Sequence, residues 1–474
     1  MAEPARRTTA RGVLAISGRV LAVVVATGVS VLVVLAVLLL PVPSYQRAEA
    51  GIPVTPGLDA VQRACGGPFL QTGLDASDPS RLVPLGAGFS TQAATTGGAA
   101  ATTTALAPYD PSSGAPGAPV VSAPSAALVQ LAQAQAVSTD RARGLAAAAC
   151  PAPSQDFWLV GGATTVGQST VLVIGNPSEV TATVDVAIFG PDGRVPASSG
   201  GLVVQAGQQR AVSMNGLAPD LPSLVVHVTS RGGNIVGQLQ QSTIETLTAT
   251  GLDAVSAQVP STSLVLPGVL IQDSGAQVPT DADGDPSDLR AVRILVVGDQ
   301  PANVTVSTVP EDGSAPTVLA QQIVQPQHAT QLGLEGLVQG AQTVLVSSEQ
   351  PVVAAVVTET FTDAGRDYAW AVPAPLQQQA FAVAVPAMSS PVLHVYNPGS
   401  APATVQLGGA GASIPALTVP PGRSVGVTLP PGSYTAQTSA PVQAALVGWG
   451  GGQLASLPVL APDAAASTLL VYPR

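Results

Sequence analysis

A Gly-x-Ser-x-Gly pentapeptide at residues 422–426 has the pattern that surrounds the nucleophile of serine hydrolases. That chemistry needs a sharp turn between a strand and a helix, with an Asp and then a His further along the chain. Here Ser424 opens a β-branched run, and the last histidine, His394, precedes it. The pentapeptide therefore predicts a strand rather than a catalytic serine.

Four aspartates form the densest acidic cluster and are a weak candidate for a calcium site. Carboxylates at alternate positions suit a hard cation such as Ca²⁺. An EF-hand loop also needs Gly at its sixth position and an acid at its twelfth, where this chain has Pro286 and Val292. The alternative is a solvated insertion between two strands. The cluster consists of Asp281, Asp283, Asp285 and Asp288.

Histidine and tryptophan each occur three times, and neither type shows a binding pattern. The histidines have no metal-binding spacing, so a zinc site would need ligands that converge from separate domains. The tryptophans could stack on sugar rings, but each lies in an apolar run, which favours a place in the core. The residues are His227, His328 and His394, and Trp158, Trp370 and Trp449.

The two cysteines, Cys65 and Cys150, allow one intramolecular disulfide in an oxidising compartment. The bridge would close a loop of 84 intervening residues, worth up to ~4–5 kcal/mol in the chain-entropy model. A reactive thiol is the alternative, and it would want a neighbouring His or a cationic site. No His precedes His227, so the sequence favours the disulfide.

An uncharged apolar segment at residues 20–40 predicts a transmembrane helix. Its 21 residues would span about 31 Å as a helix, close to the thickness of the hydrocarbon core. Four Arg residues precede it, which places the N-terminus in the cytoplasm and everything after Pro41 outside the membrane. A signal peptide cleaved after Ala50 is the alternative, although the apolar stretch is long for one.

One pattern occurs three times after residue 150, about a hundred residues apart. Each copy has an apolar run, then Asn-Pro or a close relative, then an alternating Thr/Val run. Such repetition indicates one supersecondary unit used several times. Pro sets φ at the first turn position, and Asn bonds the backbone two residues on. The turns are Asn176-Pro177, Asp299-Gln300-Pro301 and Asn397-Pro398.

Each copy contains about seven short β-branched runs separated by turn signals, which is typical of an immunoglobulin-like sandwich. A β-propeller would need a repeat of ~40–50 residues. Pro177 and Pro301 are 124 residues apart, and Pro301 and Pro398 are 97 apart. The spacing therefore favours sandwiches.

Residues 41–150 are the least regular part. The run 97–127 is rich in Ala, Thr, Pro and Gly, and its composition predicts a flexible segment. The run 127–149 has helix-favouring composition and suggests a short helix before Cys150, with a strand and linker as the alternative.

Composition excludes one class of partner. The chain of 474 residues carries a formal net charge of −11, and all 17 basic residues are Arg. After the apolar segment, 13 Arg stand against 27 acids, a balance of about −14. A nucleic-acid-binding protein needs clustered cations, so this class is not expected.

Short motifs resemble those of actinobacterial membrane-anchored envelope proteins of unknown function. The residues that carry the resemblance are Cys150-Pro151, the run Trp158-Leu159-Val160-Gly161-Gly162, and Asn176-Pro177. The resemblance implies a place in the cell envelope and an association with glycosyltransferase systems. It implies no catalytic residue.

Together these observations predict an all-β protein, with three tandem immunoglobulin-like sandwiches after one N-terminal transmembrane helix. We expect a non-enzymatic binding or scaffold protein of the cell envelope, without cofactors, that could support assembly of cell-wall polymers. A carbohydrate-binding or adhesion protein and an envelope glycan hydrolase are the alternatives. The predicted divisions are a cytoplasmic tail at 1–19, the membrane helix at 20–40, an irregular segment at 41–150, and sandwiches at 151–262, 263–378 and 379–474.

Overall fold

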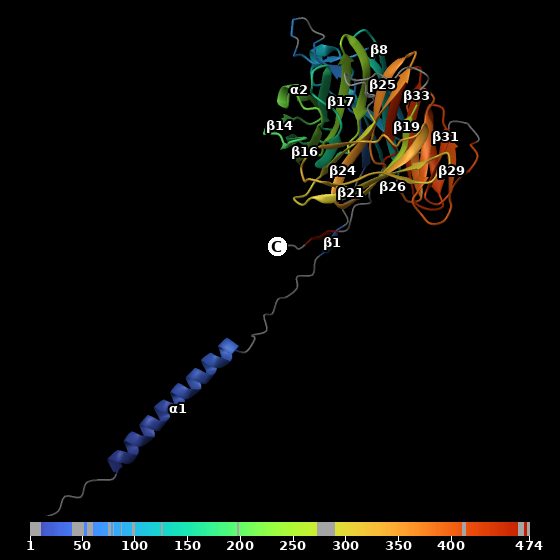
Figure 1. Cartoon of the computed structure of the whole chain (residues 1–474). Coiled ribbons are helices and arrows are strands. Elements are labelled where there is room, and N and C mark those ends of the chain that lie inside the picture. The colour runs from blue at the N-terminus through green and yellow to red at the C-terminus, as the bar shows by residue number, and fades with distance from the viewer. Residues whose placement is uncertain are drawn as a thin grey trace, which may run out of the picture. The chain divides into compact units, whose positions relative to one another are not determined.

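The chain is mostly β, with 60% strand and 6% helix. The computed structural model (Figure 1) divides it into two compact units. Residues 57–465 form one, here called the β unit, and residues 1–56 with 466–474 form the other, the terminal unit. The described residues are 11–39, 52–54, 60–73, 77–78, 80–86, 88–96, 100–124, 127–196, 199–272, 290–409, 414–462 and 469–471.

The terminal unit contains one long helix and one strand pair. Helix α1 spans Arg11–Leu39 and covers the apolar segment predicted at 20–40, up to Leu39. Strand β1 (Ile52–Val54) pairs antiparallel with β35 (Leu469–Val471). Among the described residues, no helix is both long and apolar enough to cross a membrane.

Copy 1, which begins near residue 154, consists of two antiparallel sheets. One has the order β10-β16-β12, with β13 and β14 both paired to β12. The other has the order β15-β11-β17-β18. A short helix, α2 (Met214–Leu217), follows β15. The strands are β10 (Asp156–Val160), β11 (Gln168–Gly175), β12 (Ala182–Gly190), β13 (Gly193–Arg194), β14 (Ser199–Val204), β15 (Gln209–Ser213), β16 (Val225–Gly232), β17 (Val236–Glu245) and β18 (Thr248–Val255).

Copy 2 repeats this order in a single seven-stranded sheet. Its long strand β24 first pairs with β19 and β21, and then with β20 and β25. The two halves of β24 thus take the positions that β16 and β17 have in copy 1. The sheet forms a nearly closed barrel. The strands are β19 (Ser261–Ile271), β20 (Ala291–Val296), β21 (Ala302–Pro310), β22 (Thr317–Val324), β23 (Thr330–Gly333), β24 (Gly340–Thr362) and β25 (Gly365–Ala371).

Copy 3 returns to two sheets, ordered β27-β32-β29-β30 and β31-β28-β33-β34, with β26 also paired to β33. These orders match those of copy 1, except that β13 and β26 have no counterpart in the other copy. The strands are β26 (Leu376–Gln377), β27 (Ala380–Val385), β28 (Val392–Asn397), β29 (Ala403–Gly409), β30 (Leu417–Val419), β31 (Arg423–Thr428), β32 (Gly432–Thr438), β33 (Val442–Gly450) and β34 (Gln453–Pro458).

A fourth, shorter copy precedes the three that the sequence predicts. Its sheets β2-β7-β6 and β5-β8-β9 have the order of copy 1 without the outer strands. The run 97–127, predicted to be flexible, contains β6, β7 and a 3₁₀ turn. The run 127–149, for which a short helix was predicted with a strand as the alternative, forms β8 and β9. The elements are β2 (Ala60–Ala64), β3 (Leu70–Gln71), β4 (Val83–Pro84), β5 (Ser90–Thr95), β6 (Thr102–Leu106), η1 (Pro111–Ser113), β7 (Ala118–Pro124), β8 (Val129–Ser138) and β9 (Arg143–Ala149).

Tertiary pairing explains why the alanine-rich run 127–149 is not helical. β8 pairs with β5 on one side and β9 on the other. Ala132 and Ala134 are buried in a core shared with other strands, where a small side chain lets the sheets approach closely. Helix propensity is a weak prior, and such packing overrides it.

A hairpin ends each copy, and the second strands of the four hairpins meet at the centre of the β unit. β9 packs against β18, β18 against β25, β25 against β34, and β34 against β9. Figure 1 shows these hairpins side by side in the upper part of the unit. The copies therefore surround a common centre, whereas the sequence predicted a tandem arrangement.

Hydrophobic cores cross the borders between the copies. Trp158 of copy 1 shares a core with Val353 and Trp370 of copy 2. Ala147 of the N-terminal copy shares another with Phe381 of copy 3. The copies are thus joined by buried apolar contacts, which is why residues 57–465 form one unit.

The strand order also differs from that of immunoglobulin domains. In the constant-type immunoglobulin fold the first two strands belong to one sheet. In copy 1 the first strand, β10, pairs with β16, whereas the second strand, β11, lies in the other sheet between β15 and β17. The sequence predicts about seven strands per copy, whereas copies 1 and 3 each have nine, and the order of the strands depends on long-range pairing.

Candidate functional site

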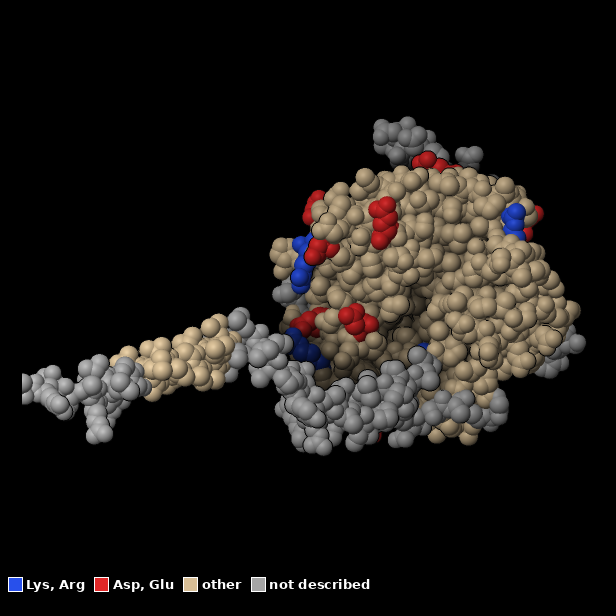
Figure 2. Space-filling model, turned by 90° about the horizontal axis from the view of Figure 1, so that it is seen from below, with Lys and Arg blue, Asp and Glu red and all other residues tan. Residues whose placement is uncertain are grey.

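A pocket of about 410 Å³ lies where the four copies join. Its walls come from the segments that directly follow the four central strands: Pro151 after β9, residues 257–259 after β18, residues 373–376 after β25, and Leu460 after β34. The volume falls within the range of small-molecule sites. Figure 2 views the β unit from below, and the described surface on this face is hollowed and carries few charged side chains.

Most of the pocket wall is apolar, and its polar groups are few. Among the described lining residues Asp156 is the only ionisable one, and 65% of its side chain is exposed. Its Oδ1 lies 3.0 Å from Nε2 of His227, whose ring stacks on Trp158. The wall therefore presents one acidic group at a solvent-accessible place and an apolar surface elsewhere.

Two glutamines at the pocket differ in how fully they are bonded. Gln258 pairs with both backbone groups of Ala354, since its Oε1 accepts the N–H at 3.1 Å and its Nε2 donates to the C=O at 3.0 Å. Gln443 donates from Nε2 to the carbonyl of Ala374 at 3.4 Å, while its buried Oε1 has no partner among the described residues. That oxygen is shielded from solvent, so a ligand in the open pocket does not reach it in this conformation.

The carboxyl of Asp367 joins the four central strands. It lies on β25 and is fully buried. Its Oδ2 accepts the N–H groups of Leu145 at 2.8 Å and Leu454 at 3.0 Å, and its Oδ1 accepts that of Leu252 at 3.2 Å. The three donors belong to the three other copies. Burial raises the pKa of Asp367 well above its usual value, more than the backbone donors lower it.

A second buried carboxyl, Asp253 on β18, lies near Asp367. Its Oδ2 accepts the N–H of Trp370 at 2.6 Å. Its Oδ1 has no hydrogen-bond partner among the described residues. Burial raises the pKa of Asp253 to about 8, against the opposing effect of nearby backbone N–H groups. Both carboxyls hold strands together and neither reaches the surface.

A buried arginine bonds the backbone of Gly162, the last residue of the run 158–162. Arg293 of copy 2 donates from Nη1 to the carbonyl oxygens of Gly162 at 2.6 Å and Leu224 at 3.1 Å. Its guanidinium lies 4.6 Å from the ring centroid of Trp370. Burial lowers the pKa of Arg293 to about 9. The run therefore serves the junction between copies 1 and 2.

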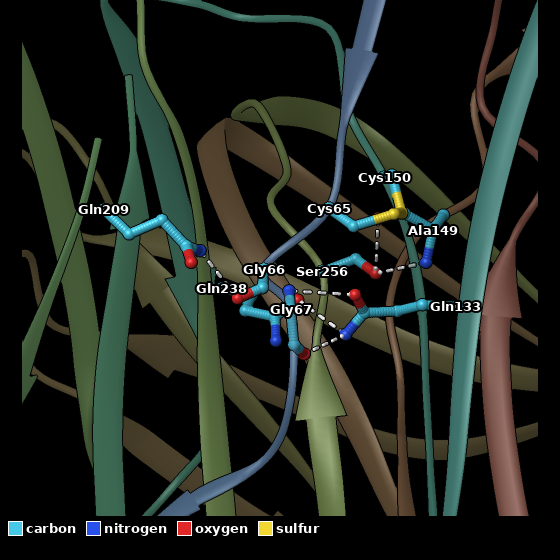
Figure 3. Close-up of a disulfide and its surroundings, with 9 residues drawn as sticks. All are labelled: Cys65, Gly66, Gly67, Gln133, Ala149, Cys150, Gln209, Gln238 and Ser256. Atoms are coloured by element: carbon cyan, nitrogen blue, oxygen red, sulfur yellow. Dashed lines mark hydrogen bonds between the residues drawn. A yellow bond between two sulfur atoms is a disulfide. The ribbon is translucent and has the colours of Figure 1, made fainter. Parts of the chain in front are cut away.

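The predicted disulfide is present: Cys65 and Cys150 are bonded, and each is 1% exposed. It holds the segment 65–70 between β8 and β17 (Figure 3). The backbone of residues 66–68 is bonded by glutamine side chains, whereas Cys65 donates to the carbonyl of Pro119 on β7 and Phe69 accepts from the N–H of Leu85. Gln133 bonds both the N–H and the C=O of Gly67 at 3.1 Å, and Gln240 accepts from the N–H of Leu70 at 2.8 Å.

Gly66 leaves room for a glutamine side chain in the same arrangement. Gln209 donates to its carbonyl at 2.8 Å. A Cβ at this position would lie 2.1 Å from Cδ of Gln238, a buried side chain. Figure 3 shows the amide group of Gln238 directly beside this glycine. The Cys-Gly-Gly-Pro sequence is thus matched to the close approach of the glutamines.

The other candidate residues are dispersed. Ser424 is buried on strand β31, and its hydroxyl bonds the hydroxyl of Thr343. This agrees with the strand that the sequence predicts at this pentapeptide. The three histidines lie at three separate places. His227 bonds Asp156, His328 bonds the carbonyl of Pro191, and His394 bonds Glu311. Among the described residues no group of three His, Cys, Asp or Glu could hold a metal ion. The calcium candidates Asp281, Asp283, Asp285 and Asp288 lie outside the described residues.

Two of the tryptophans are core residues. Trp158 and Trp370 are 4% and 3% exposed, which agrees with the core interpretation and leaves no face for a sugar. Trp449 on β33 is half-buried.

The Asn-Pro turns have the structural role that the sequence predicts. Asn176 is buried; it donates to the carbonyls of Val180 and Val204, both at 2.9 Å, and accepts from the N–H of Ser178 at 3.1 Å. Asn397 makes the same three bonds in copy 3. In copy 2, by contrast, Asp299 is exposed.

Sequence reasoning missed the pocket, the Asp367 centre and the fourth copy. One signal for the fourth copy was available. The run AAAACPAP, which ends at Pro153, has the same small and proline-rich character as the ends of the other copies, such as YAWAVPAP, which ends at Pro375. Asp253 and Asp367 carry no such signal, because an isolated acid within a strand usually indicates an exposed face.

No curated protein matches this chain. Residues 110–413, more than half of the sequence, match a family described as a family of unknown function, DUF5719. The match begins within the N-terminal copy, spans copies 1 and 2, and ends in copy 3. The chain therefore belongs to the DUF5719 family.

Proposed function

We propose that this protein is a non-enzymatic, membrane-tethered protein of the cell envelope, whose β unit binds an apolar ligand outside the cytoplasm. The observation that carries the proposal is the apolar pocket at the junction of the four copies. A site built from the ends of all four copies is a place where one ligand can contact every copy at once. Such a protein would act as a binding or scaffold component in the assembly of envelope polymers.

The proposed location follows from the N-terminal segment and the disulfide. The apolar residues 20–40, preceded by four arginines, are the proposed anchor. A buried disulfide is typical of proteins that fold in an oxidising compartment, which supports an extracytoplasmic β unit. Reporter fusions test this: alkaline phosphatase, which needs an oxidising compartment, should be active after residue 272 and inactive after residue 10. Activity in the reverse order would contradict the topology.

A glycan hydrolase, the enzymatic alternative, would need two carboxyl groups facing a cleft. Asp253 and Asp367 are the buried carboxyls at the centre of the fold, and both are 0% exposed and bonded to backbone N–H groups. They cannot contact a polysaccharide without opening the unit. A carbohydrate-binding role would need exposed aromatic faces, whereas Trp158 and Trp370 are buried and Trp449 is half-buried. Both facts favour the pocket.

The binding function is tested by filling the pocket. Ala152 lines it and is half-buried, so Ala152→Trp should block it without entering a core. The full-length protein is purified from its own membranes, and organic extracts are compared by mass spectrometry. We expect an apolar compound in the wild-type extract that is absent from the Ala152→Trp extract.

Ala315→Trp, at an exposed place far from the pocket lining, is the matched control and should retain the compound. Unfolding temperature and an intact disulfide on a non-reducing gel show that each variant is folded. Extracts of wild type and Ala152→Trp that do not differ would contradict the proposal.

A further inference from the structure

The pocket has a charge pattern that restricts its ligand. Its walls are formed by apolar side chains such as Phe157, Leu264 and Val265, and by Pro151, Pro373 and Leu460. Among the described lining residues none is cationic, and the one ionisable group is the carboxyl of Asp156. An anionic group placed here would lose water without gaining an opposite charge, which is costly.

Most polar side chains of the pocket are already bonded within the protein. The side-chain amide of Gln258 is fully used by Ala354, and the hydroxyl of Ser154 donates to the carbonyl of Asp156. The carboxylate of Asp156, which is 65% exposed, is the charged acceptor that a ligand in the pocket can reach.

We propose that the pocket binds an apolar chain whose polar end donates hydrogen bonds and is cationic, and that it discriminates against anionic ends. This inference rests on the proposed function and specifies its ligand class. The chain contacts the apolar walls, and the carboxylate of Asp156 accepts a hydrogen bond from the polar end and stabilises its positive charge. An alkyl ammonium is the simplest molecule of this class.

The test uses photoreactive probes and the full-length protein in phosphatidylcholine vesicles. Three dodecyl chains carry the same diazirine and end in a primary ammonium, a hydroxyl or a carboxylate. After irradiation, mass spectrometry measures the labelling of peptides that line the pocket, normalised to labelling of the phospholipid. This normalisation removes differences in partitioning between the probes.

We expect the ammonium chain to label the pocket about tenfold more than the carboxylate chain, with the hydroxyl chain between them. Asp156→Asn should bring the ammonium chain to the level of the hydroxyl chain. Ala315→Trp should change nothing.

The outcomes separate the two proposals. If Ala152→Trp abolishes pocket labelling but the carboxylate chain labels as well as the ammonium chain, the ligand class proposed here is wrong and the binding function stands. If Ala152→Trp leaves the labelling of all three chains unchanged, both proposals fail. Equal labelling by the ammonium chain in wild type and Asp156→Asn would also overturn the role of Asp156.

Discussion

At the scale of single residues, the two central carboxyls show how burial decides the role of an acid. Among the described residues no cation contributes to the pKa of Asp253, and burial raises that pKa to about 8. The carboxyl is therefore neutral at pH 7 in the folded protein, whereas in the unfolded chain it ionises near pH 4. Neutral Asp253 can bond the backbone without the cost of a buried charge.

This difference predicts how stability depends on pH. Between about pH 4 and pH 8 the unfolded chain binds fewer protons than the folded protein at this site, so the contribution of Asp253 to stability falls as pH rises. Asp253→Asn removes the titration and should stabilise the protein at pH 7 by on the order of 2 kcal/mol. Denaturant unfolding at pH 5, 7 and 9 measures the effect. Asp299→Asn, at an exposed residue, is the control. Equal pH slopes for wild type and Asp253→Asn would show that Asp253 does not titrate in this range.

At the scale of elements, the Asn-Pro turns connect the second and third strands of copies 1 and 3. Each buried asparagine bonds three backbone groups, two carbonyls and one N–H. The bonds fix the exit from one sheet and the entry into the other. The Asn side chain therefore acts as part of the backbone hydrogen-bonding system.

Loss of either asparagine should be costly and independent of the other. Asn176→Ala and Asn397→Ala should each lower the free energy of unfolding by about 2 kcal/mol, because buried backbone groups lose their partners. The turns lie in different copies, so the double variant should show the sum within about 0.5 kcal/mol. Chemical denaturation measures the three variants. Asp299→Ala should fall within about 0.5 kcal/mol of wild type. A similar loss for Asp299→Ala would show that the turn position, rather than these bonds, is what matters.

At the scale of the whole molecule, Asp367 and the disulfide connect segments that are far apart in the sequence. Asp367 bonds backbone N–H groups of the three other copies. Asp367→Ala would leave three buried donors unbonded, at about 1–3 kcal/mol for each. We expect a large drop in the unfolding temperature, and faster amide hydrogen exchange at Leu145, Leu252 and Leu454 together. Protection lost on β25 alone would contradict the connecting role. Asp185→Ala, at a surface ion pair, is the control and should leave exchange at the centre unchanged.

The disulfide should behave as a structural crosslink. Both sulfurs belong to residues that are 1% exposed, so a reductant should reach them only when the β unit unfolds. Cys65→Ser with Cys150→Ser should lower stability by up to ~4–5 kcal/mol. Thiol labelling after mild reduction, with and without denaturant, checks the burial. Labelling at equal rates in both conditions would show that the bond is accessible in the native protein.

The sequence determined the features that local pattern encodes. Alternating Thr/Val runs predicted strands such as β12 and β21, whose burial alternates in the same way. Repeated Asn-Pro predicted equivalent turns, and Asn176 and Asn397 make identical bonds. Two cysteines without a nearby histidine predicted the disulfide. The strands and turns depend on a few consecutive residues. The disulfide could be predicted because each cysteine has only one other cysteine with which to pair.

Only the tertiary structure decided how the copies are assembled. Leu145 and Asp367 are 222 residues apart, and neither has a neighbour in sequence that marks it as part of a centre. β8 and β9 are strands because they pair and pack within the β unit, although their composition favours a helix. The pocket exists only where the ends of four copies converge. Such features depend on which distant surfaces bury one another, and the periodicity of a single chain does not specify that.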